Sequence, residues 1–444
     1  MLPLLLLLLL LPMRSLPLRL LPLHLPASQL PTRHLPSRLY SSSGAQWRGV
    51  VKAVDNGKHK HTYAYPSSAL SGLPFPPPYS ASSPPFFVLG VETSCDDTCA
   101  AVLLSDGTVL SEAKASQTDL HEGYGGVVPN LAKGAHEAAI GPVIARALAD
   151  AGVAAAELGA VAATVGPGLE ICLRVGARAA RGIAAEHGLP FAAVHHLEAH
   201  ILMSRLPPAA EVTFPFLALL VSGGHCQLLR CGGLGRCEVV GGTLDDSLGE
   251  AYDKVARMLG LPVGGGGGPA VEELALEGDH RNVKLPVPMQ QRKDCDFSFA
   301  GLKNAFRMAN GRARELRGVG EGEELPRLDR ADLAASFQWS AVRHLEQRVG
   351  RAMGRCEEEG AGIDRLVVVG GVAANAAVRG ALERLCGERG WQFSAPEPRL
   401  CTDNGVMAAW AGIEKLRAGV SDDAGADEVF ARYPFARPRE EGPL

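Results

Sequence analysis

Residues 214–242 read FPFLALLVSGGHCQLLRCGGLGRCEVVGG, and this stretch decides the fold. It begins with an apolar strand, passes through the small-residue turn Ser222-Gly223-Gly224-His225, and returns in a second strand. A glycine-rich turn and a third strand complete it. The expected strands are 214–221, 226–230 and 237–241.

Residues 86–113 have the same order of elements. An apolar strand, 86–93, ends in the polar turn 94–98, a second strand follows, and the hairpin signal Asp106-Gly107 leads into a third. An internal repeat of this kind predicts an α/β protein with two similar domains that face each other across a central cleft.

Helical patterns alternate with further buried strands in the rest of the chain. Glycine turns follow two of these strands, GPGL at 166–169 and GGVAAN at 370–375. Such turns at the carboxyl ends of strands are where α/β proteins bind ligands. The expected helices are 131–151, 173–187, 248–259, 331–359, 376–389 and 406–417, and the further strands are 160–165, 190–194 and 365–369.

Charge is distributed unevenly along the 444 residues. Residues 1–85 hold eight Lys and Arg against one Asp, so their net charge is +7 and that of residues 86–444 is −11, within a total of −4. This balance argues against indiscriminate nucleic-acid binding. The ten cysteines include no Cys-x-x-Cys pair, which disfavours a zinc ribbon or a disulfide framework and favours reduced thiols.

Residues 1–85 are expected to be a transit peptide and a Pro/Ser-rich linker. The first 54 residues contain no acidic residue and have scattered arginines and many leucines, and Arg38-Leu39-Tyr40-Ser41-Ser42 resembles a mitochondrial processing site. Composition favours a mitochondrial over a plastid destination, with secretion third. No apolar run of about 20 residues occurs, so no transmembrane span is expected.

His196 and His200, in the segment HLEAH, are i and i+4 on an expected helix and therefore share one face. Two such imidazoles form half of a divalent-metal site, although two ordinary histidines also fit the pattern. Asp403, in CTDNG, can complete the site as an oxygen ligand or serve only in capping the helix that follows. Glu198 points about 160–200° away from both histidines, which favours a structural role.

Other segments suggest anion and nucleotide contacts. The turn 222–224 lets backbone N–H groups approach an anion closely, although it also fits a plain turn. Asp253 can hold a ribose hydroxyl or be a surface charge. Arg307, Arg312, Arg314 and Arg317 can form a solvated helix face or contact RNA phosphates.

Taken together, these segments resemble the tRNA N6-adenosine threonylcarbamoyltransferase family, once known as a glycoprotease family. The matching segments are GVETSCDDT (90–98), GYGGVVPNLA (123–132), GPGL (166–169), HHLEAH (195–200), LLVSGGH (219–225), GEAYDK (249–254), DFSFAGLK (296–303), GGVAAN (370–375) and CTDNG (401–405). With its basic leader, the chain resembles the organelle-type member.

The resemblance implies the fold of actin, the heat-shock chaperone ATPases and the sugar kinases. A first domain would span 86–195, completed by a C-terminal helix at about 405–435, and a second would span 196–404. The resemblance also implies that His196, His200 and Asp403 hold one divalent metal ion per subunit, Fe²⁺ or Zn²⁺. The residues implied to bind the adenylate of the donor are Leu220, Val221, Ser222, Gly223, Gly224, Asp253, Gly268, Glu272 and Asn375.

Two positions depart from the family pattern. The glycine loop 264–268 is longer, which leaves Gly267 as an alternative to Gly268, and Ala300 replaces a serine of the DFSFSG motif.

The implied activity is that of an acyltransferase. It moves an L-threonylcarbamoyl group from threonylcarbamoyl-AMP to N6 of adenosine 37 in tRNAs that read ANN codons. A separate synthase would supply the donor, tRNA would be the acceptor, and the chain would form a homodimer. The alternatives are a metal-dependent glycoprotease, whose usual motif places Glu directly after the first His, and an ATP-dependent kinase of the same fold.

Overall fold

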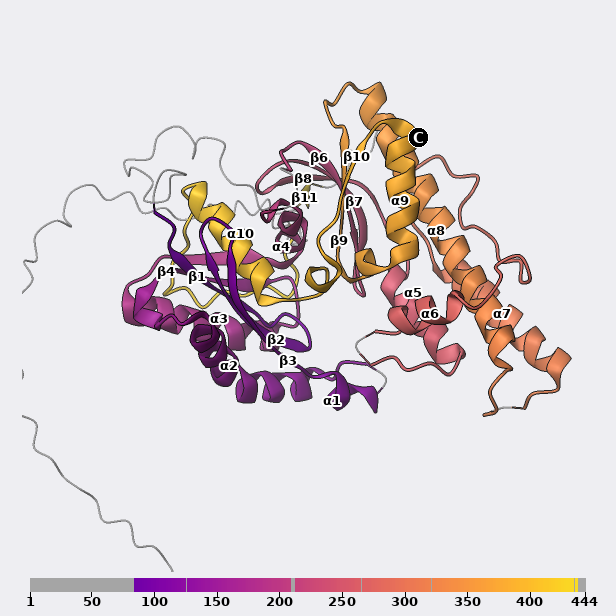
Figure 1. Cartoon of the computed structure of the whole chain (residues 1–444), viewed down its shortest axis with the longest axis horizontal. Coiled ribbons are helices and arrows are strands. Elements are labelled where there is room, and N and C mark those ends of the chain that lie inside the picture. The colour runs from indigo at the N-terminus through magenta and orange to yellow at the C-terminus, as the bar shows by residue number, and fades with distance from the viewer. Residues whose placement is uncertain are drawn as a thin grey trace, which may run out of the picture. The chain divides into compact units, whose positions relative to one another are not determined.

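The computed structural model describes residues 84–124, 126–208, 212–264, 266–320, 322–434 and 436–437. The leader and processing site expected within residues 1–83 lie outside this range. Two mixed β-sheets with helices against their faces form the described part (Figure 1). No helix in these ranges has the length and apolar character needed to cross a membrane.

The first sheet has the strand order β3-β2-β1-β4-β5. Its first three strands form an antiparallel meander, and β4 and β5 then run parallel to β1. The strands are β1 (Phe87–Glu92), β2 (Asp97–Leu104), β3 (Val109–Ser116), β4 (Leu158–Gly166) and β5 (Phe191–His195).

The second sheet repeats this arrangement in the order β10-β9-β6-β7-β8, with the short β11 added at the edge. Here β6, β7 and β8 form the meander, and β9 and β10 are the parallel strands. The repeat confirms the predicted α/β fold with two similar sheets. The strands are β6 (Phe216–Val221), β7 (Cys226–Gly233), β8 (Arg236–Gly242), β9 (Arg365–Val369), β10 (Gln392–Ser394) and β11 (Ala436–Arg437).

Alternate residues of β1 point into different cores, as the pleat of a strand requires. Leu89 packs with α2 (Pro129–Ala151) and α3 (Glu170–His187) on one face of the first sheet. Val88 packs with α10 (Gly405–Arg417) on the other face. Helix α10, from the C-terminal part of the chain, therefore covers the sheet formed by strands β1 to β5.

Gly90 allows α10 to approach β1 closely. A Cβ at this position would lie 2.2 Å from the Ala409 nitrogen and 2.5 Å from the Gly405 oxygen. Only a residue without a side chain fits there.

A large helical layer covers one face of the second sheet, and α4 (His196–Leu202) packs against its other face. Val221 of β6 belongs to the first of these cores and Leu220 to the second. The helices of the large layer are α5 (Leu248–Met258), α6 (Gly268–Ala275), α7 (Ala300–Arg317), α8 (Arg327–Glu358) and α9 (Ala376–Arg389).

Three element predictions differ from the structure. The C-terminal helix expected to reach about 435 ends at Arg417, because Gly419 takes a left-handed φ of 75° and the chain turns back. Asp422 then hydrogen-bonds the Phe191 carbonyl at 2.8 Å. Residues 300–317 form the regular helix α7, which was only a possibility in the sequence, and the short helix α1 (Thr118–Glu122) was not expected.

Candidate functional site

The predicted metal ligands lie at the carboxyl end of the first sheet. His196 is the first residue of α4, directly after β5, and His200 follows one turn later. Asp403 lies in the loop before α10, where Asn404 caps the helix by accepting a hydrogen bond from the Met407 N–H at 2.8 Å. The end of β5 and the start of α4 therefore position the two histidines, and the capped start of α10 positions Asp403.

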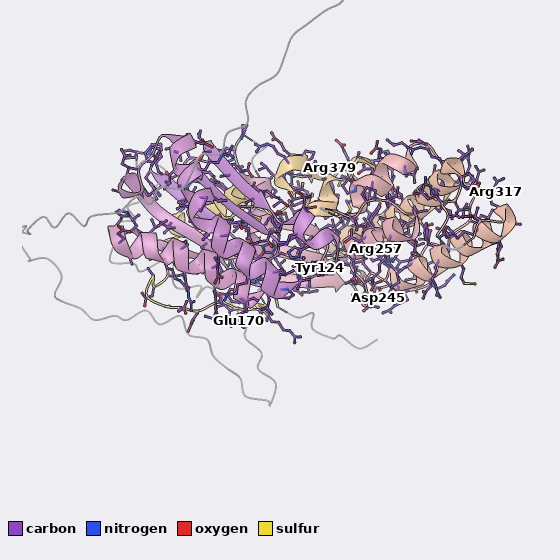
Figure 2. All side chains as sticks on the ribbon, turned by 90° about the horizontal axis from the view of Figure 1, so that it is seen from below. Tyr124, Glu170, Asp245, Arg257, Arg317 and Arg379 are labelled. Carbon is purple, nitrogen blue, oxygen red and sulfur yellow. The ribbon has the colours of Figure 1, made fainter. Side chains whose placement is uncertain are left out.

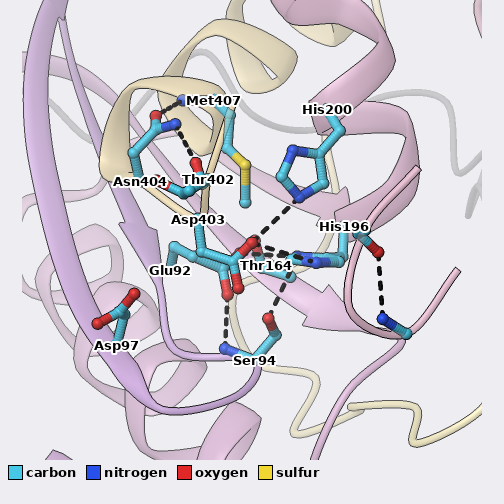
Figure 3. Close-up of polar contacts among 12 residues, drawn as sticks. Glu92, Ser94, Asp97, Thr164, His196, His200, Thr402, Asp403, Asn404 and Met407 are labelled. Carbon is cyan, nitrogen blue, oxygen red and sulfur yellow. Dashed lines mark hydrogen bonds and ion pairs between the residues drawn. The ribbon is translucent and has the colours of Figure 1, made fainter. Parts of the chain in front are cut away.

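The structure brings His196, His200 and Asp403 together (Figure 3). The Asp403 Oδ1 atom lies 3.1 Å from His200 Nε2 and 3.7 Å from His196 Nε2. Two ligands of a tetrahedral metal with bonds of about 2.1 Å lie about 3.4 Å apart. One carboxylate and two imidazoles at this spacing therefore fit a divalent metal ion.

Carboxylates control the charge of this cluster. Burial opposes protonation of His196, but Asp403 and Glu92 outweigh it and raise the pKa of His196 to about 9. Burial alone would raise the pKa of Asp403, yet the two histidines hold it well below its usual range. The carboxylate of Asp403 thus carries a negative charge between the two imidazoles, an arrangement that favours a cation.

Glu92 and Ser94 lie beside His196, and Thr164 lies beside Glu92. The sequence analysis did not name these three residues as part of the site. Its Nδ1 atom lies 3.3 Å from Glu92 Oε2 and 3.2 Å from Ser94 Oγ. Glu92 also accepts hydrogen bonds from the Thr164 hydroxyl and, at 2.5 Å, from the Ser94 N–H. The sequence signals were that Glu92 ends an apolar strand in an acidic turn and that Glu92 and Ser94 lie in the matching segment GVETSCDDT.

Glu198 has a different environment. Its carboxylate is buried and accepts a hydrogen bond from the Gly235 N–H, in the β7–β8 turn, at 2.6 Å. Glu198 therefore joins α4 to the second sheet.

The predicted adenylate contacts Leu220 to Gly224 form the end of β6 and the turn after it. Leu220 and Val221 are buried, whereas Gly223 and Gly224 are exposed and have open space around them. The Ser222 hydroxyl accepts hydrogen bonds from the N–H groups of Gly224 and His225. These contacts shape the turn, and the Gly223 carbonyl also accepts a hydrogen bond from the Ser247 hydroxyl.

The remaining predicted contacts lie around the starts of α6 and α9. Asp253 accepts a hydrogen bond from the Gly267 N–H at 2.6 Å, and the adjacent Gly268 has open space around it. Glu272 accepts the Ala376 N–H at 2.6 Å, and Asn375 caps α9 by accepting the Val378 N–H at 2.9 Å. Burial raises the pKa of both Asp253 and Glu272.

Two glycines after β9, Gly370 and Gly371, pack between the predicted adenylate turn at 220–224 and the predicted metal ligand Asp403. A Cβ on Gly370, whose φ is 92°, would lie 2.4 Å from the Val221 oxygen, so the β9 turn packs onto the end of β6. A Cβ on Gly371 would lie 3.8 Å from Thr402 Cγ2, next to Asp403. The glycine turns after β6 and β9 and the cluster of His196, His200 and Asp403 are thus neighbours.

A cavity of about 370 Å³ opens beside Asn375, between α6, α8 and α9. Gln338 lines it and accepts a hydrogen bond from the Asn375 amide at 3.1 Å. Trp339, 40% exposed, stacks on His280 with ring centroids 5.1 Å apart and planes 10° apart. The sequence analysis missed this pair, because the two rings are far apart along the chain.

Two members of the arginine cluster on α7 have intramolecular partners among the described residues. Arg314 donates to the Gly320 and Glu323 carbonyls, and Arg317 forms a two-point ion pair with Asp329. Figure 2 shows Arg317 toward the outer end of the helical layer. Arg307 and Arg312 are exposed.

Comparison with known proteins gives a consistent result. The family model described as TsaD, tRNA N6-adenosine threonylcarbamoyltransferase, matches residues 108–410. A relative from Arabidopsis thaliana, named as the probable mitochondrial form of that enzyme, is 48% identical over 76% of this chain and 70% of its own length. A relative from Ruegeria pomeroyi with the same enzyme name is 47% identical over 76% of this chain and 90% of its own.

Solved structures match weakly. One is component A of (R)-2-hydroxyglutaryl-CoA dehydratase from Acidaminococcus fermentans, which is 13% identical with a TM-score of 0.43 over 74% of this chain and 99% of that chain. The family model and the two relatives each cover most of this chain. The chain therefore belongs to the tRNA N6-adenosine threonylcarbamoyltransferase family.

Proposed function

We propose that this protein transfers the threonylcarbamoyl group of threonylcarbamoyl-AMP to N6 of adenosine 37 in tRNAs that read ANN codons. The observation that carries the proposal is the His196–His200–Asp403 cluster beside the glycine turns of β6 and β9, in a chain of this family. One divalent metal ion per subunit, Fe²⁺ or Zn²⁺, would be held by these three residues and would supply Lewis-acid polarisation when bound.

The adenylate portion of the donor has a matching environment. We place its phosphate at the exposed turn of Gly223 and Gly224, where the lack of side chains lets an anion approach the backbone closely. Asp253 of α5 and Glu272 of α6, two neighbouring helices, would accept from the ribose hydroxyls. The cavity beside Asn375 can hold the adenine, with Trp339 as a stacking surface.

The reaction needs little further activation. The amine nitrogen of adenosine attacks the carbamoyl carbon, the bond from that carbon to the phosphate oxygen breaks, and AMP leaves with the electron pair, while its phosphate takes up the proton that the amine loses. The leaving group is already good because the donor is a mixed anhydride. The protein's task is therefore to hold the two substrates in register and stabilise the charge on the phosphate.

The contact of Glu198 argues against the rival glycoprotease function. A protease of that type needs a carboxylate beside the metal to activate water. The Glu198 carboxylate instead receives the Gly235 N–H, away from Asp403. The Glu92 carboxylate lies beside the ring of His196 and is fully buried, so it is closed to a water nucleophile.

The proposal includes partners and a location. A separate synthase would supply threonylcarbamoyl-AMP, tRNA would be the acceptor, and two copies of the chain would form a homodimer. The basic leader and the Arabidopsis relative named as mitochondrial support a mitochondrial over a plastid location.

A transfer assay tests the function. The purified full chain is mixed with threonylcarbamoyl-AMP and an unmodified ANN-reading tRNA, and nucleosides are analysed by mass spectrometry. Threonylcarbamoyl-adenosine should form, His196→Ala should abolish it, and Glu198→Gln should retain it. No product from the folded, metal-loaded chain, alone or with organelle extract, would refute the proposal.

A further inference from the structure

A line of polar side chains crosses the carboxyl ends of three adjacent parallel strands. Glu92 ends β1, Thr164 lies near the end of β4, and His196 follows β5. The register pairs Val91 with Ala163, so Glu92 and Thr164 are next in line on neighbouring strands. The Glu92 carboxylate accepts a hydrogen bond from the Thr164 hydroxyl on one side and faces the Nδ1 atom of His196 on the other (Figure 3).

Glu92 has no exposed surface, and its partners hold it from several sides. One oxygen, Oε1, accepts the Ser94 N–H at 2.5 Å, and the other, Oε2, accepts the Thr164 hydroxyl and lies 3.3 Å from His196 Nδ1. A buried carboxylate needs such donors, because its lone pairs have no water to bind. Its orientation is thus fixed by two strands of the sheet.

The two ring nitrogens of His196 face different groups. Nδ1 faces Glu92 and Ser94, whereas Nε2 faces Asp403 at 3.7 Å. When Nδ1 carries a proton shared with the carboxylate, Nε2 keeps its lone pair for a ligand. A carboxylate behind a ligating histidine fixes its tautomer and raises its basicity.

We propose that Glu92, held by Thr164, is a positioning residue that presents the Nε2 lone pair of His196 to the metal ion. This inference rests on the metal site of the proposed function. His200 serves as a contrast, because its Nδ1 is buried without a hydrogen-bond partner among the described residues. The two histidines are therefore not equivalent, and the Glu92–Thr164 pair controls only His196.

The test measures metal binding by the full chain, without tRNA or donor. Zn²⁺ affinity is obtained by competition with a chromophoric chelator for wild type, Glu92→Gln and Thr164→Val. Glu92→Gln should weaken binding by roughly 10–100-fold, and Thr164→Val should weaken it by less. Ser111→Ala is the matched control, because it removes a buried hydroxyl that donates to the Ala147 carbonyl in the same domain, remote from Glu92.

A spectroscopic readout separates positioning from a purely structural role. Long-range ¹H–¹⁵N spectra of the zinc-loaded chain, with the His196 signals assigned by His196→Gln, should show metal at Nε2 and a proton at Nδ1. Thr164→Val should perturb the Nδ1 signal, and Ser111→Ala should not.

The outcomes are distinct. Equal zinc affinity and unchanged His196 signals in a folded Thr164→Val and a folded Glu92→Gln would overturn the positioning role alone. Absence of zinc binding by the wild-type chain would instead overturn the metal site of the proposed function. If Glu92→Gln does not fold, Thr164→Val decides the matter.

Discussion

At the scale of single residues, Asn375 combines two roles that substitution can separate. Its Oδ1 atom caps α9, and its amide donates to Gln338 in the adjacent cavity. Asn375→Ala should therefore lower the free energy of unfolding by about 1 kcal/mol, the usual effect of losing a cap, and raise KM for the donor. Asn375→Ser should restore stability and keep the high KM. Urea unfolding and initial-rate kinetics check this, and a Ser variant with wild-type KM would contradict it.

Trp339 gives a second prediction for a single side chain. If the adenine stacks on its ring, Trp339→Ala should weaken donor binding by about 1–3 kcal/mol, roughly 5- to 150-fold, because stacking on an aromatic surface is worth that much. Trp339→Phe keeps an aromatic face and should retain most of the affinity. Equilibrium binding of AMP to the full chain measures the effect. Equal affinity in wild type and Trp339→Ala would place the base elsewhere.

The residue scale also shows what the sequence could provide. His196, His200 and Asp403 were predicted because a recognisable segment surrounds each ligand, and the structure brings them together. Glu92 and Thr164 were not, since their contact depends on which strands are neighbours and in which register, which no local pattern encodes. The stack of His280 and Trp339 depends on how two helices pack and was equally hidden.

At the scale of elements, the contact of β1 with α10 should be intolerant of any side chain. Gly90→Ala would force a Cβ into the backbone of α10, so the helix must move. Overpacking of this kind usually destabilises by about 1–3 kcal/mol. Because Asp403 lies two residues before α10, the shift should also weaken metal binding.

The matched control for that prediction is Gly134→Ala. Gly134 lies in α2, and a Cβ there has nothing within 4 Å. This variant should be as stable as wild type or slightly more so, because alanine favours a helix. Thermal unfolding and zinc titration of both variants give the comparison. A Gly90→Ala protein with wild-type melting temperature and zinc affinity would show that α10 is free to move.

Elements with strong periodicity were predictable, and those set by contacts were not. The strands of both meanders and the helices α8 and α9 follow from apolar patterns. The pattern predicted the end of α10 at residue 417 correctly, whereas the longer helix to about 435 implied by the resemblance does not form, because a left-handed glycine at 419 and the contact of Asp422 with β5 stop the helix. The role of the α7 arginines was left open, because such a cluster suits a solvated helix face and an RNA phosphate contact equally well.

At the scale of the whole molecule, stability should depend on pH through His344. This buried side chain accepts the Ser298 N–H at 3.2 Å, and burial lowers its pKa to about 4. The unfolded chain binds a proton near pH 6.5 and the folded chain does not, so the stabilisation is full above pH 6.5 and is lost as the pH falls toward 4. By pH 5 the loss should be about 2 kcal/mol.

Comparison with a variant isolates this contribution from that of other buried histidines. His344→Gln should be less stable than wild type at pH 7.5, but the difference should shrink by about 2 kcal/mol at pH 5, since glutamine does not titrate. Urea unfolding at the two pH values measures it. A constant difference between the two proteins would show that His344 titrates normally in the folded state.

Metal removal gives a second prediction for the whole molecule. A metal that binds only the folded chain stabilises it, by about 2.7 kcal/mol at a hundredfold excess over Kd. Adding Zn²⁺ to the metal-free protein should therefore raise the melting temperature, and chelation should reverse the rise. His196→Ala should melt at the same temperature with and without Zn²⁺. A rise in that variant as large as in wild type would locate the stabilising ion at another site.

The position of α10 has a consequence for when the protein becomes functional in the cell. His200 and its partner Asp403 are 203 residues apart in the chain. At a synthesis rate of about 5–20 residues per second, a ribosome needs about 10–40 s to travel between them. The first sheet can emerge well before the helix that covers it, yet the ligand set is incomplete until almost the whole chain has been made. Binding of a metal ion by all three ligands must therefore wait until residue 403 has been made, and a product of premature termination before residue 403 would carry both histidines and still lack the site.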